Sequence, residues 1–149
     1  MKKKKLFVLI LFTIIISACT KNNSADSIDI AEYQWRLRSI ATSSGFSSQV
    51  PDIPWRERND RYLLTFNRES NTVGMYLIAN RWVAHYSILG QDSICLRGST
   101  TTEVGYAGNE IWVEDTINAY GSALYRFQVN NEKLVMNSDS IALVFSFEK

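Results

Sequence analysis

The 149-residue sequence has little glycine, proline, cysteine and histidine, with 7 Gly, 2 Pro, 2 Cys and 1 His. The low glycine and proline content excludes a collagen-like chain and a chain that is mostly linker. With 46% hydrophobic and 21% charged residues, the composition also excludes an intrinsically disordered chain. The length therefore predicts one folded domain with its own core.

The sequence also lacks the excess of basic residues that nucleic-acid binding requires. Sixteen Lys and Arg are balanced by fifteen Asp and Glu, and four of the lysines form one N-terminal run, Lys2–Lys5. No basic stripe with interleaved aromatic residues follows that run. These observations exclude a nucleic-acid partner.

No hydrophobic run is long enough to cross a membrane as a helix. The apolar stretch from Leu6 to Ile16 is shorter than the roughly 20 residues a spanning helix needs, and behind the lysine run it fits the core of a secretory signal. The residues that follow, up to Ala18 and Cys19, resemble the bacterial lipobox, in which small residues precede an obligatory cysteine. The resemblance implies cleavage after Ala18 and a lipid on the Cys19 sulfur. The alternative is an ordinary signal peptide with an incidental cysteine.

Cleavage divides the chain into a signal peptide (1–18), a lipidated terminus with a flexible polar tether (19–31) and a β-rich domain (32–149). The mature chain would keep 12 basic and 15 acidic residues, a net side-chain charge of −3. Cys95 would then be the one cysteine that is not lipidated, so an internal disulfide could not form. The hydrophobic core must therefore hold the fold. Thr20 follows the lipid cysteine where an Asp would favour the inner membrane, so we expect a lipid-anchored envelope protein at the outer membrane, facing the periplasm or the cell surface.

Short runs of β-branched and aromatic residues predict an antiparallel sheet or small barrel. Tyr33, Trp35 and Leu37 alternate with polar residues, which is the period of a half-buried strand. Residues 41–60 are expected to form a surface loop, and the polar segment 99–102 is expected to lead into another. The predicted strands cover residues 33–40, 62–66, 72–77, 81–89, 93–97, 124–129, 133–136 and 140–147.

One segment, residues 110–120, breaks the period of two and predicts an amphipathic helix. Its stripe recurs at i, i+4, i+7 and i+8 from Trp112. Asn109 is expected as the N-cap, and Gly121 as the C-terminal glycine. The predicted fold class is α+β and mostly antiparallel β: a small barrel-like sheet with one helix before a C-terminal three-stranded meander.

This order of elements resembles the META domain family, also called the heat-shock lipoprotein-like family, from about Trp35 to Phe145. The resemblance implies a stress-linked envelope lipoprotein. The family often has a cysteine before its Asn and another after its Thr pair; here Ala79 takes the first position, so no role of those cysteines is implied. The leading Trp strand also resembles lipocalin-like lipoproteins, which implies a carrier of a small apolar ligand. The residues that match the META domain family are Trp35-Arg36-Leu37, Thr65-Phe66, Gly74, Asn80, Tyr86, Thr101-Thr102, Glu110, 133–136 and 141–145.

The residues able to carry chemistry do not form a catalytic or metal-binding pattern. His85 has no Cys, His or Asp at ligand spacing, and there is no Gly-x-Ser-x-Gly motif. We expect His85 on the polar face of its strand and Cys95 as a buried or half-buried thiol without a cationic neighbour. Glu114 and Asp115 are expected on a solvated helix face. The sequence predicts no cofactor and no enzymatic activity.

The remaining candidate is the loop around Trp55, Arg56 and Arg58. An exposed Trp flanked by arginines would make a recognition anchor, or Trp55 folds back as a plug over one end of the barrel. Gly74, Gly105, Gly108 and Gly121 are expected in turns or bulges. The predicted function is a membrane-anchored envelope lipoprotein with a non-catalytic binding or structural role, whose partner is an unidentified envelope protein or a small apolar ligand.

Overall fold

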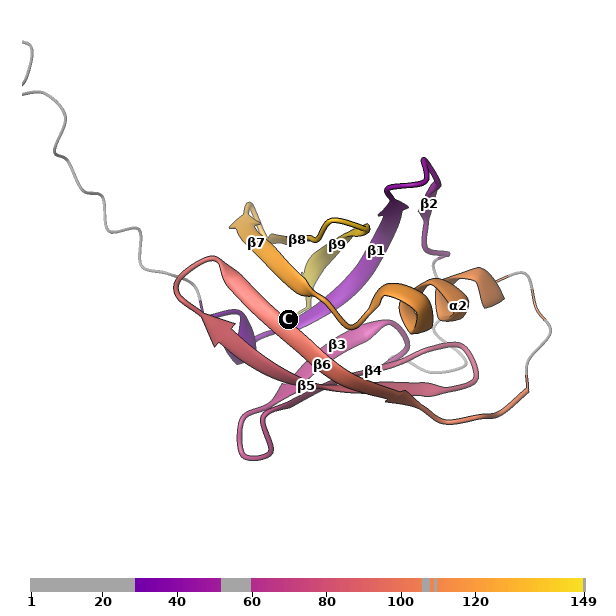
Figure 1. The fold of residues 1–149 in the computed structure, drawn as a ribbon, viewed down its shortest axis with the longest axis horizontal. Helices are drawn as coiled ribbons and strands as arrows, with labels where there is room; N and C mark the ends of the chain where they lie inside the picture. The colour runs from indigo at the N-terminus through magenta and orange to yellow at the C-terminus, as the bar shows by residue number, and fades with distance from the viewer. Residues whose placement is uncertain (1–28, 52–59, 106–107, 109, 149) are drawn as a thin grey trace, which may run out of the picture.

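The computed structural model describes residues 29–51, 60–105, 108 and 110–148. They form a closed barrel of eight antiparallel strands with one helix at one end, which confirms the predicted fold class (Figure 1). A short 3-10 turn, η2 (Ile30–Glu32), precedes the barrel, and the helix α2 spans Ile111–Tyr120. The strands are β1 (Gln34–Thr42), β2 (Ser47–Gln49), β3 (Leu63–Asn67), β4 (Thr72–Tyr76), β5 (Arg81–Leu89), β6 (Ser93–Thr101), β7 (Leu124–Asn130), β8 (Lys133–Asn137) and β9 (Ile141–Glu148).

The barrel closes between β1 and β9, the first and last strands. They pair from Gln34 opposite Glu148 to Thr42 opposite Ile141. On its other edge β1 pairs with β3 at its start and with β2 near its end, so β2 is an addition outside the closed ring. An ion pair of 2.5 Å between Arg36 Nε and Glu148 Oε1 crosses the β1–β9 seam.

Side chains fill the interior, as the period-two patterns predict. Trp35 and Phe145 are 1% exposed and Tyr125 is fully buried. Beside Trp82 and Met136 the structure leaves a gap of about 10 Å³, no more than a single water molecule needs. The barrel is therefore a packed core at this position and not a ligand chamber.

The helix α2 lies where β6 ends and β7 begins, and it packs on this end of the barrel (Figure 1). Val113 and Ile117 are buried, whereas Tyr120 is 40% exposed. The predicted stripe from Trp112 to Tyr120 is thus rotated, because the helix turns Glu114 inward toward a buried polar partner described below. Asn109 lies outside the described residues, and the structure begins the helix with Glu110 as N-cap, without a side-chain capping bond.

Two strands and one glycine differ from the sequence predictions. β2 lies inside the predicted loop 41–60, where its pairing with β1 decides its conformation. β6 continues to Thr101, because Thr100 and Thr101 pair with β5. Gly74 lies in the middle of β4 and not in a turn.

Gly121 ends the helix as predicted, and its backbone is right-handed. Its φ is −64°. A Cβ at this position would lie 3.0 Å from Trp82 Cζ2 and 2.5 Å from the Ile117 carbonyl oxygen. Glycine is needed here because the Ile117 carbonyl oxygen and the Trp82 ring both approach this position closely.

The strand directions place the two ends of the domain. β1 starts at the end where the turns after β3, β5 and β7 lie, and the helix covers the opposite end (Figure 1). The chain preceding Ile30 therefore joins the barrel at the end away from α2. Within the described part of the chain, no helix has the length and hydrophobicity to cross a membrane.

Candidate functional site

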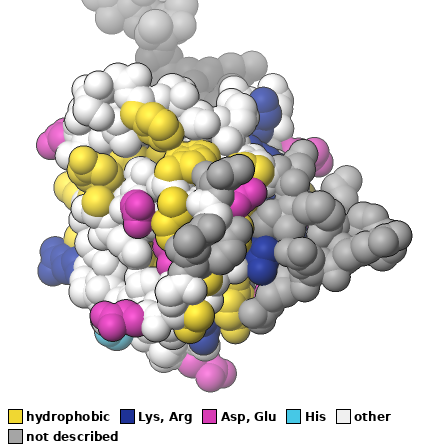
Figure 2. Space-filling view, turned by 90° about the vertical axis from the view of Figure 1, so that its right-hand side faces the viewer, with side chains coloured by type: hydrophobic (Ala, Val, Ile, Leu, Met, Phe, Trp, Pro, Cys, Tyr) yellow, Lys and Arg dark blue, Asp and Glu magenta, His cyan; other side chains and the backbone are white. Residues whose placement is uncertain are grey.

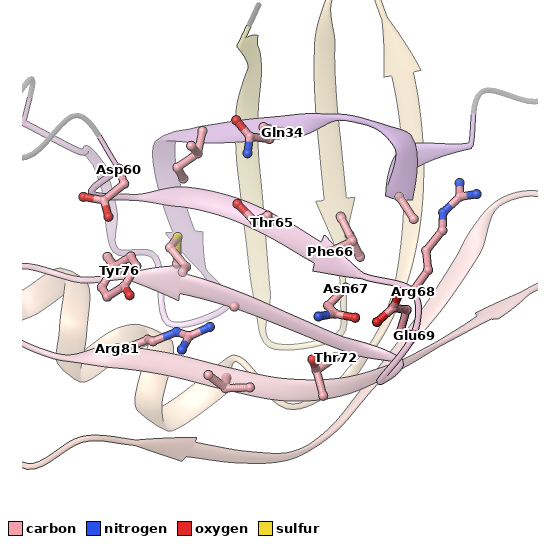
Figure 3. A pocket seen from close by; sticks show the side chains of 15 residues that line it. Gln34, Asp60, Thr65, Phe66, Asn67, Arg68, Glu69, Thr72, Tyr76 and Arg81 are labelled. Atoms are coloured by element: carbon pink, nitrogen blue, oxygen red, sulfur yellow. The ribbon is translucent and has the colours of Figure 1, made fainter.

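A groove of about 730 Å³ runs over the outer face of β3, β4 and β5, beside the start of β1 (Figure 3). Because side chains alternate along a strand, residues between the buried core positions of these strands point out into it. Thr65, Gly74 and Val83 lie opposite one another across the three strands and line its floor. Gln34 contributes from β1. Among the described residues, most of the groove lining therefore comes from β3, β4 and β5 over the packed core.

Gly74 makes the middle of this floor shallow. It has no side chain at a position where its neighbours across the sheet, Thr65 and Val83, both carry one. A Cβ built on Gly74 would lie 3.7 Å from Arg81 Nη2. The guanidinium of Arg81 therefore extends along the sheet to the position that a Gly74 side chain would approach.

Arg81 and Tyr76 form a cross-strand pair at one end of the groove (Figure 3). The guanidinium carbon of Arg81 lies 5.4 Å from the centroid of the Tyr76 ring, within the range of a cation–π contact. Among the described residues, no carboxylate forms an ion pair with Arg81. The ring therefore orients a guanidinium whose N–H groups remain available.

The other end of the groove carries a compensated charge. Arg68 Nη2 lies 2.5 Å from Asp29 Oδ2 and 3.6 Å from Glu32 Oε1. All three side chains are about half exposed, so these pairs contribute little stability, but they neutralise Arg68. Asn67 Oδ1 accepts from the Ser70 backbone N–H at 3.0 Å and holds the β3–β4 turn.

A buried polar network connects the groove to the helix. Asn80, which is 7% exposed, directly precedes Arg81. Its Oδ1 accepts from the backbone N–H of Val104 at 2.7 Å and from Thr102 Oγ1 at 3.0 Å. Its Nδ2 donates to Val104 O at 3.0 Å and to Glu114 Oε1. The network holds Asn80 in place and thereby positions Arg81, the first residue of β5.

Glu114 corrects the expectation of a solvated helix face. It is 4% exposed, whereas Asp115 is exposed as predicted. Glu114 lies three residues before the buried Ile117, so both share one side of the helix. That spacing, together with Asn80 as a possible donor, was the sequence signal that could have predicted a buried Glu114. Glu114 Oε2 and Trp82 Nε1 are buried and have no hydrogen-bond partner among the described residues.

Two aromatic residues, the exposed Phe46 and the half-buried Trp112, pack on each other at the helix end. Phe46 and Trp112 meet edge to face, with ring centroids 5.3 Å apart, and so fasten the β1–β2 connection to α2. Figure 2, which faces this end, shows hydrophobic side chains interrupted by acidic and polar ones. We assign this surface a packing role.

The other residues singled out in the sequence are dispersed. His85 is exposed on the outer face of β5, as predicted. Cys95 is a buried free thiol, also as predicted, but it does have a cationic neighbour: Arg97 Nε donates to Cys95 Sγ at 3.0 Å. Both project from the outer side of β6, because they are two residues apart in one strand. Within the described ranges, no three His, Cys, Asp or Glu residues gather as metal ligands would.

Tyr125 is buried beside the end of the helix. Its hydroxyl donates to the Tyr120 carbonyl oxygen at 2.9 Å, with a longer contact of 3.4 Å to the Gly121 carbonyl oxygen. Desolvation by burial raises the pKa of the Tyr125 hydroxyl above its ordinary value. The residue is a buried donor that satisfies the last carbonyl groups of α2.

Several sequence-predicted site residues lie outside the described residues: the lipidation pair Ala18 and Cys19, and the loop residues Trp55, Arg56 and Arg58. Sequence reasoning did not identify the groove. The groove residues occupy outward positions of three separate strands. In the sequence these positions look like ordinary solvent-facing residues, because the order of the strands in the sheet is not known.

No protein-family model matches this sequence, and no curated protein matches it. Among solved structures, the chain is similar to an NMR structure of a protein from Burkholderia xenovorans, with 12% sequence identity, a TM-score of 0.61, and coverage of 78% of this chain and 82% of that one. A crystal structure of an uncharacterised protein from Bacteroides eggerthii aligns at 17% identity and a TM-score of 0.48, over 78% of this chain and 98% of that one. The first similarity shows that this barrel fold occurs in another bacterial protein.

Proposed function

We propose that this protein is a lipid-anchored, non-catalytic binding protein of the bacterial envelope, and that it binds through the groove over β3, β4 and β5. The observation that carries the proposal is Arg81, which is stacked on Tyr76 beside the open floor at Gly74 and has no carboxylate partner among the described residues. An oriented guanidinium without an internal partner is better explained by an external ligand than by stability, since a partly exposed stacking contact contributes only about 0.5–1 kcal/mol.

The packed interior favours the groove over an internal carrier site. Ligand pockets commonly measure about 300–1,000 Å³. The groove reaches about 730 Å³, whereas the gap inside the barrel is about 10 Å³. A lipocalin-like carrier would have to displace buried side chains such as Trp82 and Met136 before it could accept a ligand.

The lipobox-like sequence and the strand directions support the anchoring part of the proposal. The chain joins the barrel at the end away from α2. Nine residues separate Cys19 from Asp29, and an extended chain of that length reaches about 30 Å. A lipid on Cys19 would thus hold the barrel near a membrane with the groove along its side, open to the envelope. The resemblance to the META domain family agrees with this location.

The anchoring part is tested by labelling with a palmitate analogue in a bacterial host. Wild-type protein should take up the label and stay in the membrane fraction. Cys19→Ser should lose both properties, and Cys95→Ser, the matched control, should keep both. Wild-type protein that carries no label, or a label removed by Cys95→Ser, would contradict lipidation at Cys19.

The binding part is tested with the mature chain from residue 19 carrying Cys19→Ser. The low-molecular-weight fraction of an enzymatic envelope digest is titrated into ¹⁵N-labelled protein. Backbone amides of Thr65, Gly74 and Arg81 should shift, and those of β7 and β8 should not. No shift in the groove would contradict binding there.

A further inference from the structure

We infer that the groove binds a neutral oligosaccharide. The inference rests on the proposed binding role of the groove and adds the chemical class of its ligand. Its basis is the combination of balanced charge, side chains that both donate and accept hydrogen bonds, and a floor opened by Gly74.

The charge of the lining disfavours a strongly ionic ligand. Among the described lining residues, the two carboxylates Asp60 and Glu69 equal the two arginines, Arg68 and Arg81, in number. Arg68 is in addition paired with Asp29. An anionic ligand reaching along the groove would meet carboxylates at both ends, where Figure 3 shows Asp60 and Glu69. A cation would meet the guanidinium of Arg81, which has no carboxylate partner among the described residues. A neutral ligand avoids both conflicts.

The middle of the groove offers amide and hydroxyl groups. Gln34, Thr65 and Thr72 come from three different strands and line it together. An amide or hydroxyl can both donate and accept, which matches a sugar hydroxyl. The side chains of Gln34 and Thr65 form no hydrogen bond with the described residues, so both remain available to a ligand. Thr72 is already engaged with Ser70 through a 2.7 Å contact between their hydroxyl oxygens.

Arg81 adds directional donors at one end. A guanidinium presents several N–H groups in a fixed plane, and stacking on Tyr76 holds that plane in place. Two adjacent hydroxyl oxygens of one sugar ring can accept from such a fork. Beside it, Gly74 and the half-buried Val83 offer a flat apolar floor, which suits the C–H face of the same ring.

Two other ligand classes fit less well. A lipid chain needs a continuous apolar channel, and polar side chains interrupt this groove along its length. An extended peptide that joins a sheet needs a free strand edge. β5 is paired on both sides, and β3 pairs with β1 at Leu63 and Leu64 and with β4 from Thr65 to Asn67. The stretch of β3 without a β1 partner is therefore only three residues long.

Titration calorimetry with maltotetraose, cellotetraose and tetra-N-acetylchitotetraose tests the inference on the mature Cys19→Ser chain. At least one should bind with a dissociation constant in the millimolar range or tighter. Gln34→Met and Arg81→Met should each weaken that binding about tenfold, as expected where a polar contact to the ligand is lost. The matched controls are Gln128→Met and Arg126→Met, exposed residues on the outer face of β7, and they should leave binding within about twofold.

Thr65→Val keeps the side-chain shape and a strand-favouring residue, so it removes the hydroxyl while preserving the fold. It should weaken binding, and Thr100→Val on β6 should not. If the β7 controls weaken binding as much as the groove variants, the site is wrong. Failure of all three neutral sugars overturns the oligosaccharide class, as does binding of trigalacturonate in their place. If groove amides still shift with the envelope digest, the proposed binding role stands without the oligosaccharide class. If they do not shift, both the binding role and the oligosaccharide class are contradicted.

Discussion

The guanidinium carbon of Arg81 lies 5.4 Å from the centre of the Tyr76 ring, on the neighbouring strand. The pairing of β4 with β5 places the two residues opposite each other. The residue before Arg81, the buried Asn80, is hydrogen-bonded to Glu114 of the helix. One cross-strand pair therefore links the groove to the closed end of the barrel. Changes in either region are expected to affect the other.

Gly74→Ala should reduce ligand binding more than it reduces stability. The new methyl group would enter the floor of the groove near Arg81 Nη2 and lie 3.3 Å from the Trp82 carbonyl oxygen. We expect at least about a fivefold loss of affinity for whichever tetrasaccharide binds, with a stability change below about 1 kcal/mol. Gly105→Ala is the control, because a Cβ there meets nothing within 4 Å. Unchanged affinity in Gly74→Ala would show that the ligand does not contact this floor.

Asn80→Ala should be one of the more damaging polar substitutions. It removes the acceptor of Val104 N–H and Thr102 Oγ1 and leaves the buried Glu114 without its donor. Unsatisfied buried polar groups of this kind cost about 2–4 kcal/mol in the free energy of unfolding.

The control for Asn80 is Asn118→Ala on the exposed side of the helix, whose bond from Thr101 Oγ1 is accessible to water. It should cost less than about 1 kcal/mol. Urea unfolding followed by circular dichroism measures both variants. Equal losses in the two would mean that the Asn80 network does not stabilise the fold.

Tyr125→Phe should lower stability by about 1 kcal/mol near neutral pH, because it removes the hydrogen bond to the Tyr120 carbonyl oxygen. It should also flatten the alkaline limb of the stability profile. Burial raises the Tyr125 pKa in the folded state, so its contribution is complete below the unfolded value of about 10 and declines as the pH rises above it.

The wild-type protein should therefore lose up to about 1.4 kcal/mol per pH unit more than Tyr125→Phe above about pH 10. Urea titrations of both proteins at several alkaline pH values measure this difference. Parallel profiles for the two would show that Tyr125 ionises as readily in the folded protein as in the unfolded chain.

Gly121→Ala should destabilise the barrel end. The added Cβ would approach Trp82 Cζ2 to 3.0 Å, in a core where the ring cannot easily move. We expect a cost of about 1–3 kcal/mol, with thermal unfolding as the measurement. A combined variant, Gly121→Ala with Trp82→Phe, should recover part of the loss, because the smaller ring relieves the clash. A purely local helix-end effect would show no such recovery.

The sequence predicted the strands well because their signal is local. The alternation from Tyr33 to Leu37 identified β1 and its buried face, and the period of the helix identified α2. The inward orientation of Glu114 was missed, because it depends on Asn80, 34 residues earlier in the chain. The helix itself carried only the spacing of Glu114 from Ile117, and that spacing does not identify a partner so distant in the chain.

The groove could not be predicted for a related reason. Thr65, Gly74 and Arg81 belong to three strands, and each is an ordinary outward residue within its own segment. Only the lateral order of β3, β4 and β5 places them on one surface. The conformation of Arg81 over Tyr76 adds information that no spacing rule contains.

The most direct test of external binding is an NMR titration that observes the outside and the inside of the barrel in the same sample. Groove amides, such as those of Thr65 and Gly74, and the methyl group of the buried Met136 are followed as the tetrasaccharide is added. The groove account predicts saturable shifts of the amides with nearly unchanged Met136. Larger shifts at Met136 than in the groove would place the ligand inside the barrel and contradict the account.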